Sequence, residues 1–257
     1  MVENIFQHKR VLITGASKGL GAAFAQLLAR QGAALTLIAR SGDLLKTMIG
    51  LFSRPERHAF IELDLLDNAV IYERMQTLLQ NRGTFDLVIH CAGGGLGLHD
   101  ALLTSEQMLR SFQLNVAAGI EINRALVPEM QKQQQGTIIH IGSVASLEAH
   151  GSVSYNTSKA ALAAYVRSIG RVLIQDRIVV TGMMPGGYET HDNSFARLKK
   201  DNLQQYSEYL DKKLPRKKLG DIEELLPLLL VLAGKNNGMM AGCLVPIDGG
   251  EGKTYIY

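Results

Sequence analysis

The sequence predicts an α/β protein whose centre is a doubly wound parallel sheet of about seven strands. Short apolar runs alternate along the chain with longer amphipathic segments. Runs that are apolar at every position suit strands covered by helices on both faces, and strand–helix alternation implies right-handed parallel crossovers. The 257 residues, of which 46% are hydrophobic, are enough for one large core. We therefore expect a single domain over residues 1–257.

The predicted strands are the apolar runs themselves. They are expected over Arg10–Thr14, Leu35–Ala39, His58–Leu63, Phe85–Cys91, Thr137–Ser143, Arg177–Met183 and Cys243–Ile247. The first helix is expected over Leu20–Arg30, and a late helix begins near Asp221. Pro227 falls within the late helix and removes a backbone hydrogen bond to Glu223, so we expect a kink there.

One polar segment, from Tyr188 to Gly220, interrupts this alternation. It is rich in Lys and Gln and lies between the sixth predicted strand and the late helix. A long insertion after a parallel strand usually extends over a ligand site. Residues 188–220 are therefore predicted to form a lid over the substrate.

The first predicted strand runs into a glycine-rich turn, TGASKGLG, at residues 14–21. Gly15 allows a tight turn, Gly19 lets the backbone approach a pyrophosphate, and Gly21 permits close helix packing. Free N–H groups at the start of the next helix then face the phosphates. Because the turn follows a strand and opens a helix, it predicts a Rossmann-type dinucleotide site rather than an ordinary loop. Three further residues of the turn are candidates for cofactor binding: Ser17, Lys18 and Leu20.

The end of the second predicted strand indicates which dinucleotide binds. A carboxylate there would bind a ribose 2′-hydroxyl and repel a 2′-phosphate, but this chain has Ala39 and then Arg40. Lys18 projects toward the same region, and Arg matches phosphate oxygens well. The alternative is that both cations are simply solvated. Charge complementarity favours NADP(H) over NAD(H).

Tyr155 and Lys159 stand four residues apart, on one face if their segment is helical. A phenol with a pKa near ~10 exchanges protons poorly at neutral pH, and a nearby ammonium stabilises the phenolate. We therefore expect Lys159, together with a nicotinamide cation, to lower the pKa of Tyr155. The pattern alone is common by chance, and most instances are surface pairs.

Two more polar residues complete this set. Ser143 ends the fifth predicted strand, and Asn115 lies in the helical stretch after the fourth. With them, the chain resembles a short-chain dehydrogenase/reductase of the compact single-domain branch. The matching residues follow the family order over nearly the whole chain: Thr14–Gly21, Asp64, Cys91–Gly93, Asn115, Ser143, Tyr155 with Lys159, Pro185–Gly186 with Thr190, and Asp248–Gly250.

The resemblance implies a role for each matching position. Tyr155 is the general acid in reduction and the base in oxidation, and Lys159 lowers its pKa and holds the nicotinamide ribose. Ser143 bonds the substrate oxygen, and Asn115 supports a water that links Lys159 to solvent. The residues implied to contact the cofactor outside the glycine turn are Asp64, Leu65, Cys91, Ala92, Gly93, Tyr155, Lys159, Pro185, Gly186 and Thr190.

Some residues depart from the family pattern or need separate weighing. His90 replaces the first Asn of the family's Asn-Asn-Ala-Gly, and its ring serves a similar hydrogen bond or simply packs. Cys91 is expected to be a packing thiol rather than a redox group. His150 lies between Ser143 and Tyr155 and is a candidate for lining the substrate pocket. Because His99, His150 and His191 lack ligand spacing, we expect no metal.

The predicted activity is NADP(H)-dependent interconversion of a ketone and a secondary alcohol by direct hydride transfer. Residues 197–218 carry eight cations and three acids. Such a run is commonly a solvated face. The alternative is that it steers an anionic or carrier-linked substrate, such as a 3-oxoacyl thioester. One alternative is a regulatory or scaffold protein that binds NADP without turnover. A sugar-nucleotide epimerase or dehydratase is a third possibility, which the glycine spacing disfavours.

Composition limits the partners. The net charge is +3, Trp is absent and only two cysteines occur, so we expect no nucleic acid and no disulfide framework. No apolar run is long enough to span a membrane, and the first ten residues do not read as a secretory signal, so we expect a cytoplasmic protein. The resemblance implies a homodimer or homotetramer formed through the helices that bear Asn115 and Tyr155, and the small residues at Ala160–Ala164 allow close helix approach.

Overall fold

The described part of the chain, residues 5–190 and 193–254 of a computed structural model, forms one sheet of seven parallel strands. The strand order is β3-β2-β1-β4-β5-β6-β7. Their bounds are β1 Arg10–Thr14, β2 Ala34–Ala39, β3 Ala59–Glu62, β4 Leu87–His90, β5 Gly136–Ile141, β6 Ile178–Pro185 and β7 Leu244–Ile247. The order reverses between β1 and β4, and such a reversal opens a crevice at the carboxyl ends of the strands where ligands bind. The fold is therefore the predicted Rossmann-type α/β sheet.

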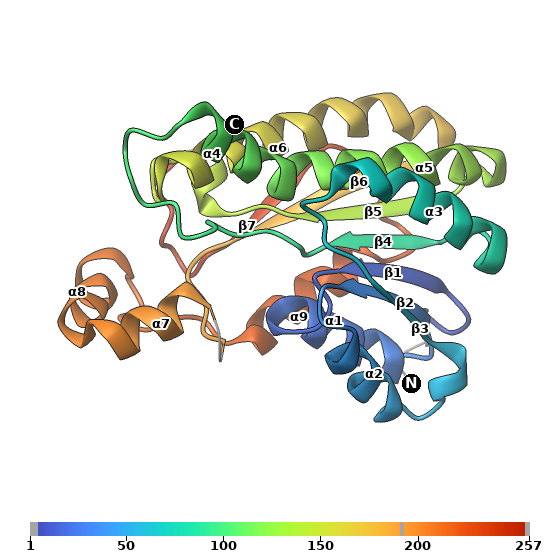
Figure 1. Cartoon of the computed structure of the whole chain (residues 1–257), viewed down its shortest axis with the longest axis horizontal. Coiled ribbons are helices and arrows are strands. Elements are labelled where there is room, and N and C mark those ends of the chain that lie inside the picture. Colours follow the sequence, from blue (N-terminus) through green and yellow to red (C-terminus); the bar gives the residue numbers. More distant parts are fainter. Residues whose placement is uncertain (1–4, 191–192, 255–257) are drawn as a thin grey trace.

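Helices cover both faces of the sheet (Figure 1). One layer contains α3 (Asn68–Arg82), α5 (Ala118–Gln133) and α6 (Val153–Leu173), with α4 (Ser105–Phe112) beside them. The opposite layer contains α1 (Gly19–Arg30), α2 (Gly42–Gly50) and α9 (Ile222–Leu232). None of the helices in the described residues is long and apolar enough to cross a bilayer.

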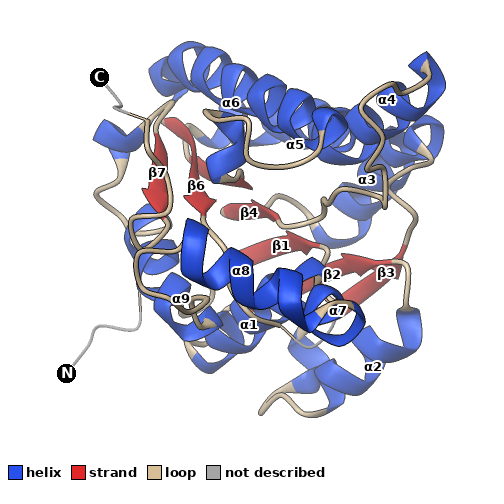
Figure 2. Cartoon of the chain, turned by 90° about the vertical axis from the view of Figure 1, so that its left-hand side faces the viewer, coloured by secondary structure: helices blue, strands red, loops and turns tan. Residues whose placement is uncertain are grey.

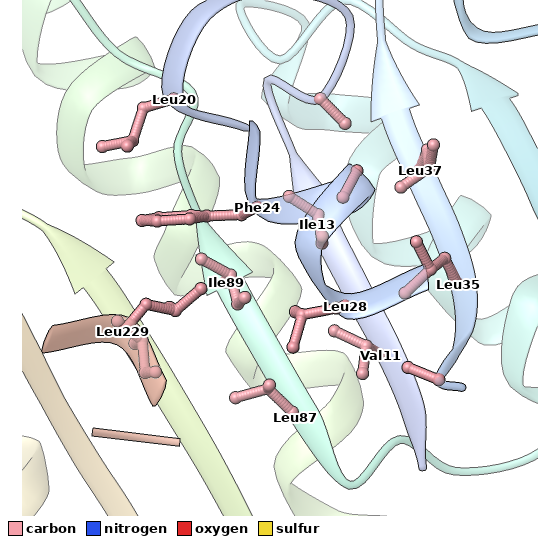
Figure 3. Packing of buried hydrophobic residues seen from close by; sticks show 14 of the residues in the cluster. Val11, Ile13, Leu20, Phe24, Leu28, Leu35, Leu37, Leu87, Ile89 and Leu229 are labelled. Atoms are coloured by element: carbon pink, nitrogen blue, oxygen red, sulfur yellow. The ribbon is translucent and has the colours of Figure 1, made fainter. Parts of the chain in front are cut away.

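Each layer has its own hydrophobic core. Successive side chains of a strand point to opposite faces, so Val11 and Ile13 of β1 join one cluster while Leu12 joins the other. Figure 3 shows Phe24 and Leu28 of α1 packed over Val11 and Ile13. Because both faces are buried, the central strands are largely apolar, which is why the sequence reveals them.

The strands differ from the predicted bounds mainly at their ends. β6 continues to Pro185 because Pro185 pairs with Ile247 of β7. β3 is shorter than predicted and begins after His58, whose Nδ1 accepts a hydrogen bond from the Leu35 backbone at 3.2 Å. The helix α9 continues through Pro227 to Leu232.

The 188–220 segment contains two helices, α7 (Ser194–Asp201) and α8 (Leu203–Lys213). They lie beyond the carboxyl ends of the strands, as Figure 2 shows. A β-bridge joins Tyr188 to Gly220, so the segment leaves and rejoins the body at neighbouring points. Its side chains form a small cluster of their own around Tyr206, Leu214 and Leu219. His191 lies outside the described residues.

Candidate active site

The glycine turn packs tightly against the strand-end loops around it. Gly15 has a φ of +63°, and a Cβ there would lie 2.8 Å from the Ala92 backbone nitrogen. Gly19 has a φ of +55°, and a Cβ there would lie 3.7 Å from Cγ2 of Thr190. A Cβ on Gly21 would collide with the Gly15 carbonyl. Only glycine satisfies these conformations and contacts at low cost, so the turn keeps its backbone exposed to a ligand.

The other predicted cofactor residues gather at the same edge of the sheet. Arg40 follows β2, Asp64 and Leu65 follow β3, and Cys91–Gly93 follow β4. Pro185 ends β6, with Gly186 after it. The loops at β1 and β4 are tied together, since the Ala92 N–H donates to Oγ1 of Thr14 at 3.2 Å.

One acid near this edge, Glu62, was not among the predicted site residues. Glu62 ends β3 opposite Ala39 of β2. Its carboxylate reaches the amino end of α2, because a Cβ on Gly42 would collide with Oε2 of Glu62. The acid therefore lies near the two residues, Arg40 and Ser41, that connect β2 to α2. The sequence feature that could have found Glu62 is its position at the end of a predicted strand. Parallel pairing brings that strand end beside the end of β2.

Asn115 sits on a π-helical turn, Gln113–Ala117, between α4 and α5. It is buried, and its Nδ2 donates to the carbonyls of Ser111 at 2.9 Å and Gly94 at 3.0 Å. The Gly94 N–H donates back to Oδ1 at 3.0 Å. Single π-helical turns inside helices occur frequently at functional sites. Here the turn and these bonds fix the amide beside the loop after β4.

Tyr155 and Lys159 lie on α6, one turn apart. Ser143 lies close enough to Tyr155 to affect the pKa of its hydroxyl, and Nζ of Lys159 lies 5.6 Å from the centre of the Tyr155 ring. Lys159 donates to the Ile141 carbonyl at 2.8 Å. A Cβ on Gly93 would lie 3.4 Å from that Nζ and 2.9 Å from Oδ1 of Asn115. The structure thus brings the four predicted catalytic side chains to one place, Asn115, Ser143, Tyr155 and Lys159.

Burial controls the protonation of this pair in the protein by itself, and the lower pKa expected for Tyr155 with both Lys159 and a nicotinamide cation stays a prediction. Burial raises the pKa of Tyr155, and the nearby Ser143 side chain opposes this only in part. Burial also lowers the pKa of Lys159 to about 8. A low-dielectric site disfavours both the phenolate and the ammonium. Tyr155 is consequently a protonated phenol at neutral pH, held ready to donate.

Behind the catalytic residues lies a buried polar cluster that includes His90. Its Nε2 lies 2.9 Å from Oδ1 of Asn123, and its ring stacks on His140 with centroids 4.3 Å apart. Nδ2 of Asn123 lies 3.3 Å from Nε2 of His140 and donates to the Tyr165 hydroxyl at 3.0 Å. Burial lowers the pKa of His90 to about 4. His90, as a neutral imidazole, therefore both makes a hydrogen bond and packs against a neighbouring ring.

The loops near Tyr155 contain further groups of interest. Tyr188 lies close enough to Tyr155 and Cys91 for their charges to affect it, although burial is the main cause of its raised pKa. Burial likewise raises the pKa of the Cys91 thiol, which suits packing rather than redox chemistry. Nε2 of His150 lies 2.6 Å from Oε1 of Glu251, a partner that sequence analysis did not find. No cluster of metal-ligand type occurs within residues 5–190 and 193–254.

The cations of the 188–220 segment are largely paired with carboxylates. Five of them have an acidic partner within 4 Å, three of these acids lying outside residues 197–218. The pairs are Lys199–Glu189, Lys212–Glu208, Arg216–Glu224, Lys217–Asp211 and Lys218–Asp221. The positive excess counted from the sequence is therefore balanced locally.

Comparison with known proteins places this geometry in a family. Residues 9–201 match the family model of the short chain dehydrogenases. The chain is 27% identical over 245 residues to 3-oxoacyl-[acyl-carrier-protein] reductase FabG of Buchnera aphidicola, covering 95% of this chain and 97% of that one. It is 30% identical over 249 residues to oxidoreductase UcpA of Salmonella typhimurium, covering 95% and 94%.

A solved structure agrees. L-sorbose reductase of Gluconobacter frateurii, complexed with NADPH and L-sorbose, superposes with a TM-score of 0.88 at 27% identity, covering 99% of this chain and 100% of that one. The matched region of the family model contains the glycine turn and the four predicted catalytic residues, Tyr155 among them. The chain belongs to the short-chain dehydrogenase family of oxidoreductases.

Proposed function

We propose that this oxidoreductase uses NADP(H) to interconvert a ketone and a secondary alcohol by direct hydride transfer. The observation that carries the proposal is the meeting of Tyr155, Ser143 and Lys159: Ser143 lies close enough to Tyr155 to lower the pKa of its hydroxyl, and Nζ of Lys159 lies 5.6 Å from the centre of the Tyr155 ring. This arrangement offers a protonated phenol and a second hydroxyl to one substrate oxygen. It is built at the sheet edge that also carries the glycine turn.

The residues present fit a dinucleotide. Side chains at Gly15 and Gly21 would collide with neighbouring backbone, so these positions keep a cradle open at the amino end of α1. Backbone N–H groups at that helix end suit a pyrophosphate. Asp64, Leu65, Ala92 and Gly93 would hold the adenosine side, and Pro185, Gly186 and Thr190 the nicotinamide side.

The preference for NADP(H) rests on charge at the end of β2. Lys18 precedes α1, and Arg40 is exposed directly after β2. The negative charge of Glu62, on the neighbouring strand, opposes the positive charge of Lys18 and Arg40. Its carboxylate, however, is turned toward Gly42 at the start of α2. The two cations favour a 2′-phosphate. The solved reductase with 27% identity was complexed with NADPH, which supports the same choice.

The chain's own residues would carry the proton steps. A nicotinamide held by the residues of the cradle would supply the hydride. Ser143 and Tyr155 hold the carbonyl oxygen between them, and Tyr155 gives its proton to that oxygen as negative charge develops. The pKa of Lys159 is about 8, so its ammonium can give up a proton near neutral pH. It would return a proton to Tyr155 after the phenol has donated its own. Asn115 holds the loop at Gly94, which keeps the Gly93 backbone beside Lys159.

The substrate class is a ketone, either free or attached to an acyl carrier. The Buchnera relative is a 3-oxoacyl-[acyl-carrier-protein] reductase, and the Gluconobacter structure contains L-sorbose, so both a thioester and a polyol ketone belong on the test panel. A scaffold protein without turnover is the second hypothesis. It has no need for a buried phenol and ammonium, which cost desolvation energy to keep.

The assembly is proposed to be a cytoplasmic homodimer or homotetramer. Exposed apolar side chains on the outer helices support association; they include Leu109, Phe112, Val153 and Val172. Isolated exposed apolar residues are common, so the assembly mass in solution, measured by light scattering, decides this point.

The function is tested with Tyr155→Phe. This change removes the transferable proton and little else, so turnover over the ketone and thioester panel should fall by about 100-fold or more. NADPH binding, measured by fluorescence titration, should stay within about threefold of wild type. Wild-type protein should bind NADPH more tightly than NADH. Unchanged turnover in the variant would contradict the mechanism, and absence of turnover in wild type over the panel would favour the scaffold.

A further inference from the structure

One buried carboxylate connects three separate segments around the candidate active site. Glu251 is 3% exposed and follows the turn after β7. Its Oε2 accepts the Gly187 N–H at 2.5 Å, and its Oε1 lies 2.6 Å from Nε2 of His150. The Tyr209 hydroxyl donates to the same Oε1. These donors come from three parts of the sequence that are distant from one another, and Glu251 joins them.

Each donor belongs to a segment that frames the reaction site. Gly187 lies in the stretch after β6 that is predicted to cover the nicotinamide. His150 lies in the loop between Ser143 and Tyr155, and the next residue packs on the phenol: a Cβ on Gly151 would lie 3.0 Å from Cδ1 of Tyr155. Tyr209 is on α8 of the 188–220 segment.

The local backbone is shaped to admit this carboxylate. A Cβ on Gly186 would collide with Oε2 of Glu251, so the approach requires glycine. Nearby, Oε1 of Glu148 accepts the Thr254 backbone N–H at 2.6 Å and the Thr254 hydroxyl at 2.8 Å. The loop that carries His150 is thereby fastened a second time to the stretch after β7.

The three donors around Glu251 favour its ionised carboxylate. Although burial opposes it, hydrogen bonds from His150, Tyr209 and Gly187 hold the pKa of Glu251 below its usual range. The hydrogen bond to Glu251 raises the pKa of His150, although burial works in the opposite direction. Burial and the adjacent carboxylate raise the pKa of Tyr209, so it stays a donor. The His150–Glu251 ion pair is therefore strongest at a pH where Glu251 is ionised and His150 is still protonated, which is above the carboxyl range and below the raised pKa of His150.

Other charged groups face His150 from the elements packed around it. Lys213, at the end of α8, lowers the pKa of His150, and Glu148, on the same loop, raises it. Both effects are smaller than that of the hydrogen bond to Glu251. Glu251 therefore sets the direction in which the charge of His150 is biased.

We infer that Glu251 is a positioning residue, which holds the 188–220 segment and the loop before Tyr155 in one arrangement over the substrate. The inference rests on the proposed carbonyl reduction. Replacing a buried ion pair with apolar side chains commonly costs nothing in stability, whereas removing one partner is costly. A buried carboxylate with three donors therefore fits a need for one fixed geometry, and it should act on substrate binding more than on the proton transfer.

The test is Glu251→Gln, with Glu208→Gln as the matched control. The substituted amide has a single oxygen, so it cannot accept from Gly187 on one side and from His150 and Tyr209 on the other. Glu208 is on the same helix as Tyr209, but it is half exposed and pairs with Lys212 in solvent. Hydrogen exchange read by mass spectrometry should accelerate several-fold in α7 and α8 of the first variant, with α1 and β1 unchanged. The control should match wild type.

Kinetics give a second readout. In Glu251→Gln, KM for the carbonyl substrate should rise about tenfold while kcat changes by less than about threefold, since the segment binds substrate without touching the transferred proton. In wild type, KM should rise as pH passes the raised pKa of His150, because the pair loses its charge. His150→Gln keeps a donor without a charge, so its KM should not depend on pH in that range.

The outcomes separate the two proposals. Exchange and KM that match wild type in Glu251→Gln would overturn the inference, as would equal exchange changes across the whole chain. If that variant does not fold, Tyr209→Phe takes its place; it should accelerate exchange in α8 in the same direction, and no change would again overturn the inference. If wild type reduces no carbonyl on the panel, the proposed function fails, while the exchange results still decide whether Glu251 holds the segment.

Discussion

At the scale of single residues, burial determines the charge on the groups that matter most. Tyr155, Lys159 and His90 are all forced toward their neutral forms by loss of solvent. A neutral phenol and a lysine near its midpoint are a suitable pair for passing one proton in either direction. His90 and His140 line this region from behind, together with a cavity of about 10 Å³, the space of one water.

The buried His90 is expected to lower the stability of the protein in acid. Its pKa is about 4 in the folded protein, against an ordinary value of 6.5, so the unfolded chain binds this proton first as pH falls. The free energy of unfolding should therefore decrease between pH 6.5 and 4, by about 3 kcal/mol from this group. His90→Asn removes the titration and should flatten the decline measured by urea unfolding. His99→Asn, at an exposed loop position, should keep the wild-type slope; equal slopes in all three proteins would contradict this explanation.

At the scale of elements, α6 positions the site by a close approach to the sheet. A Cβ on Gly170 would lie 2.5 Å from the Gly242 nitrogen and 2.9 Å from the Val180 carbonyl oxygen. Both contacts are backbone and cannot move aside easily. The helix that carries Tyr155 and Lys159 is thus seated against β6 and the turn before β7.

Gly170→Ala should consequently destabilise the protein by about 1–3 kcal/mol, the usual cost of overpacking. Gly50→Ala is the matched control, since Gly50 also lies in a helix but a Cβ there would meet no atom within 4 Å. That change should be neutral or stabilise by about 0.5–1 kcal/mol through helix propensity. Thermal unfolding of the two variants gives the comparison, and equal midpoints would show that α6 has room at this contact.

The sequence predicts elements well where one physical cause dominates. β1, β2 and β4 are buried on both faces, so their apolar runs stand out, whereas β3 at the sheet edge alternates in exposure and its run is less uniformly apolar. The four residues around Tyr155 follow from a motif. The Glu251 cluster could not be predicted in this way, because its members are 42 and 101 residues apart and meet only through the packing of α8 and the stretch after β7.

At the scale of the whole molecule, electrostatic fields are weak. The net charge is +3, and residues 188–224 contain eight basic and eight acidic residues. The acids that balance the segment lie just outside residues 197–218, at Glu189, Asp221 and Glu224, and the fold turns them back onto its cations. Substrate choice is therefore expected to depend on contacts rather than on attraction from a distance.

This expectation is measurable by ionic strength. Raising salt from about 0.05 M to 0.3 M shortens the screening length roughly twofold, which slows association only where a net field attracts the substrate. kcat/KM for an acyl-CoA thioester and for a neutral ketone should respond alike, within about twofold. A steep fall confined to the thioester would instead support steering of an anionic substrate by the 188–220 segment.

The bridge between Tyr188 and Gly220 has an evolutionary consequence. Because the chain leaves and rejoins the sheet at neighbouring residues, the stretch between them is a single continuous insertion. Changes of length within that stretch need not disturb the strands or the glycine turn, provided that Tyr209 keeps its contact with Glu251. If the proposed function holds, new substrate ranges can arise there by exchange of one continuous stretch.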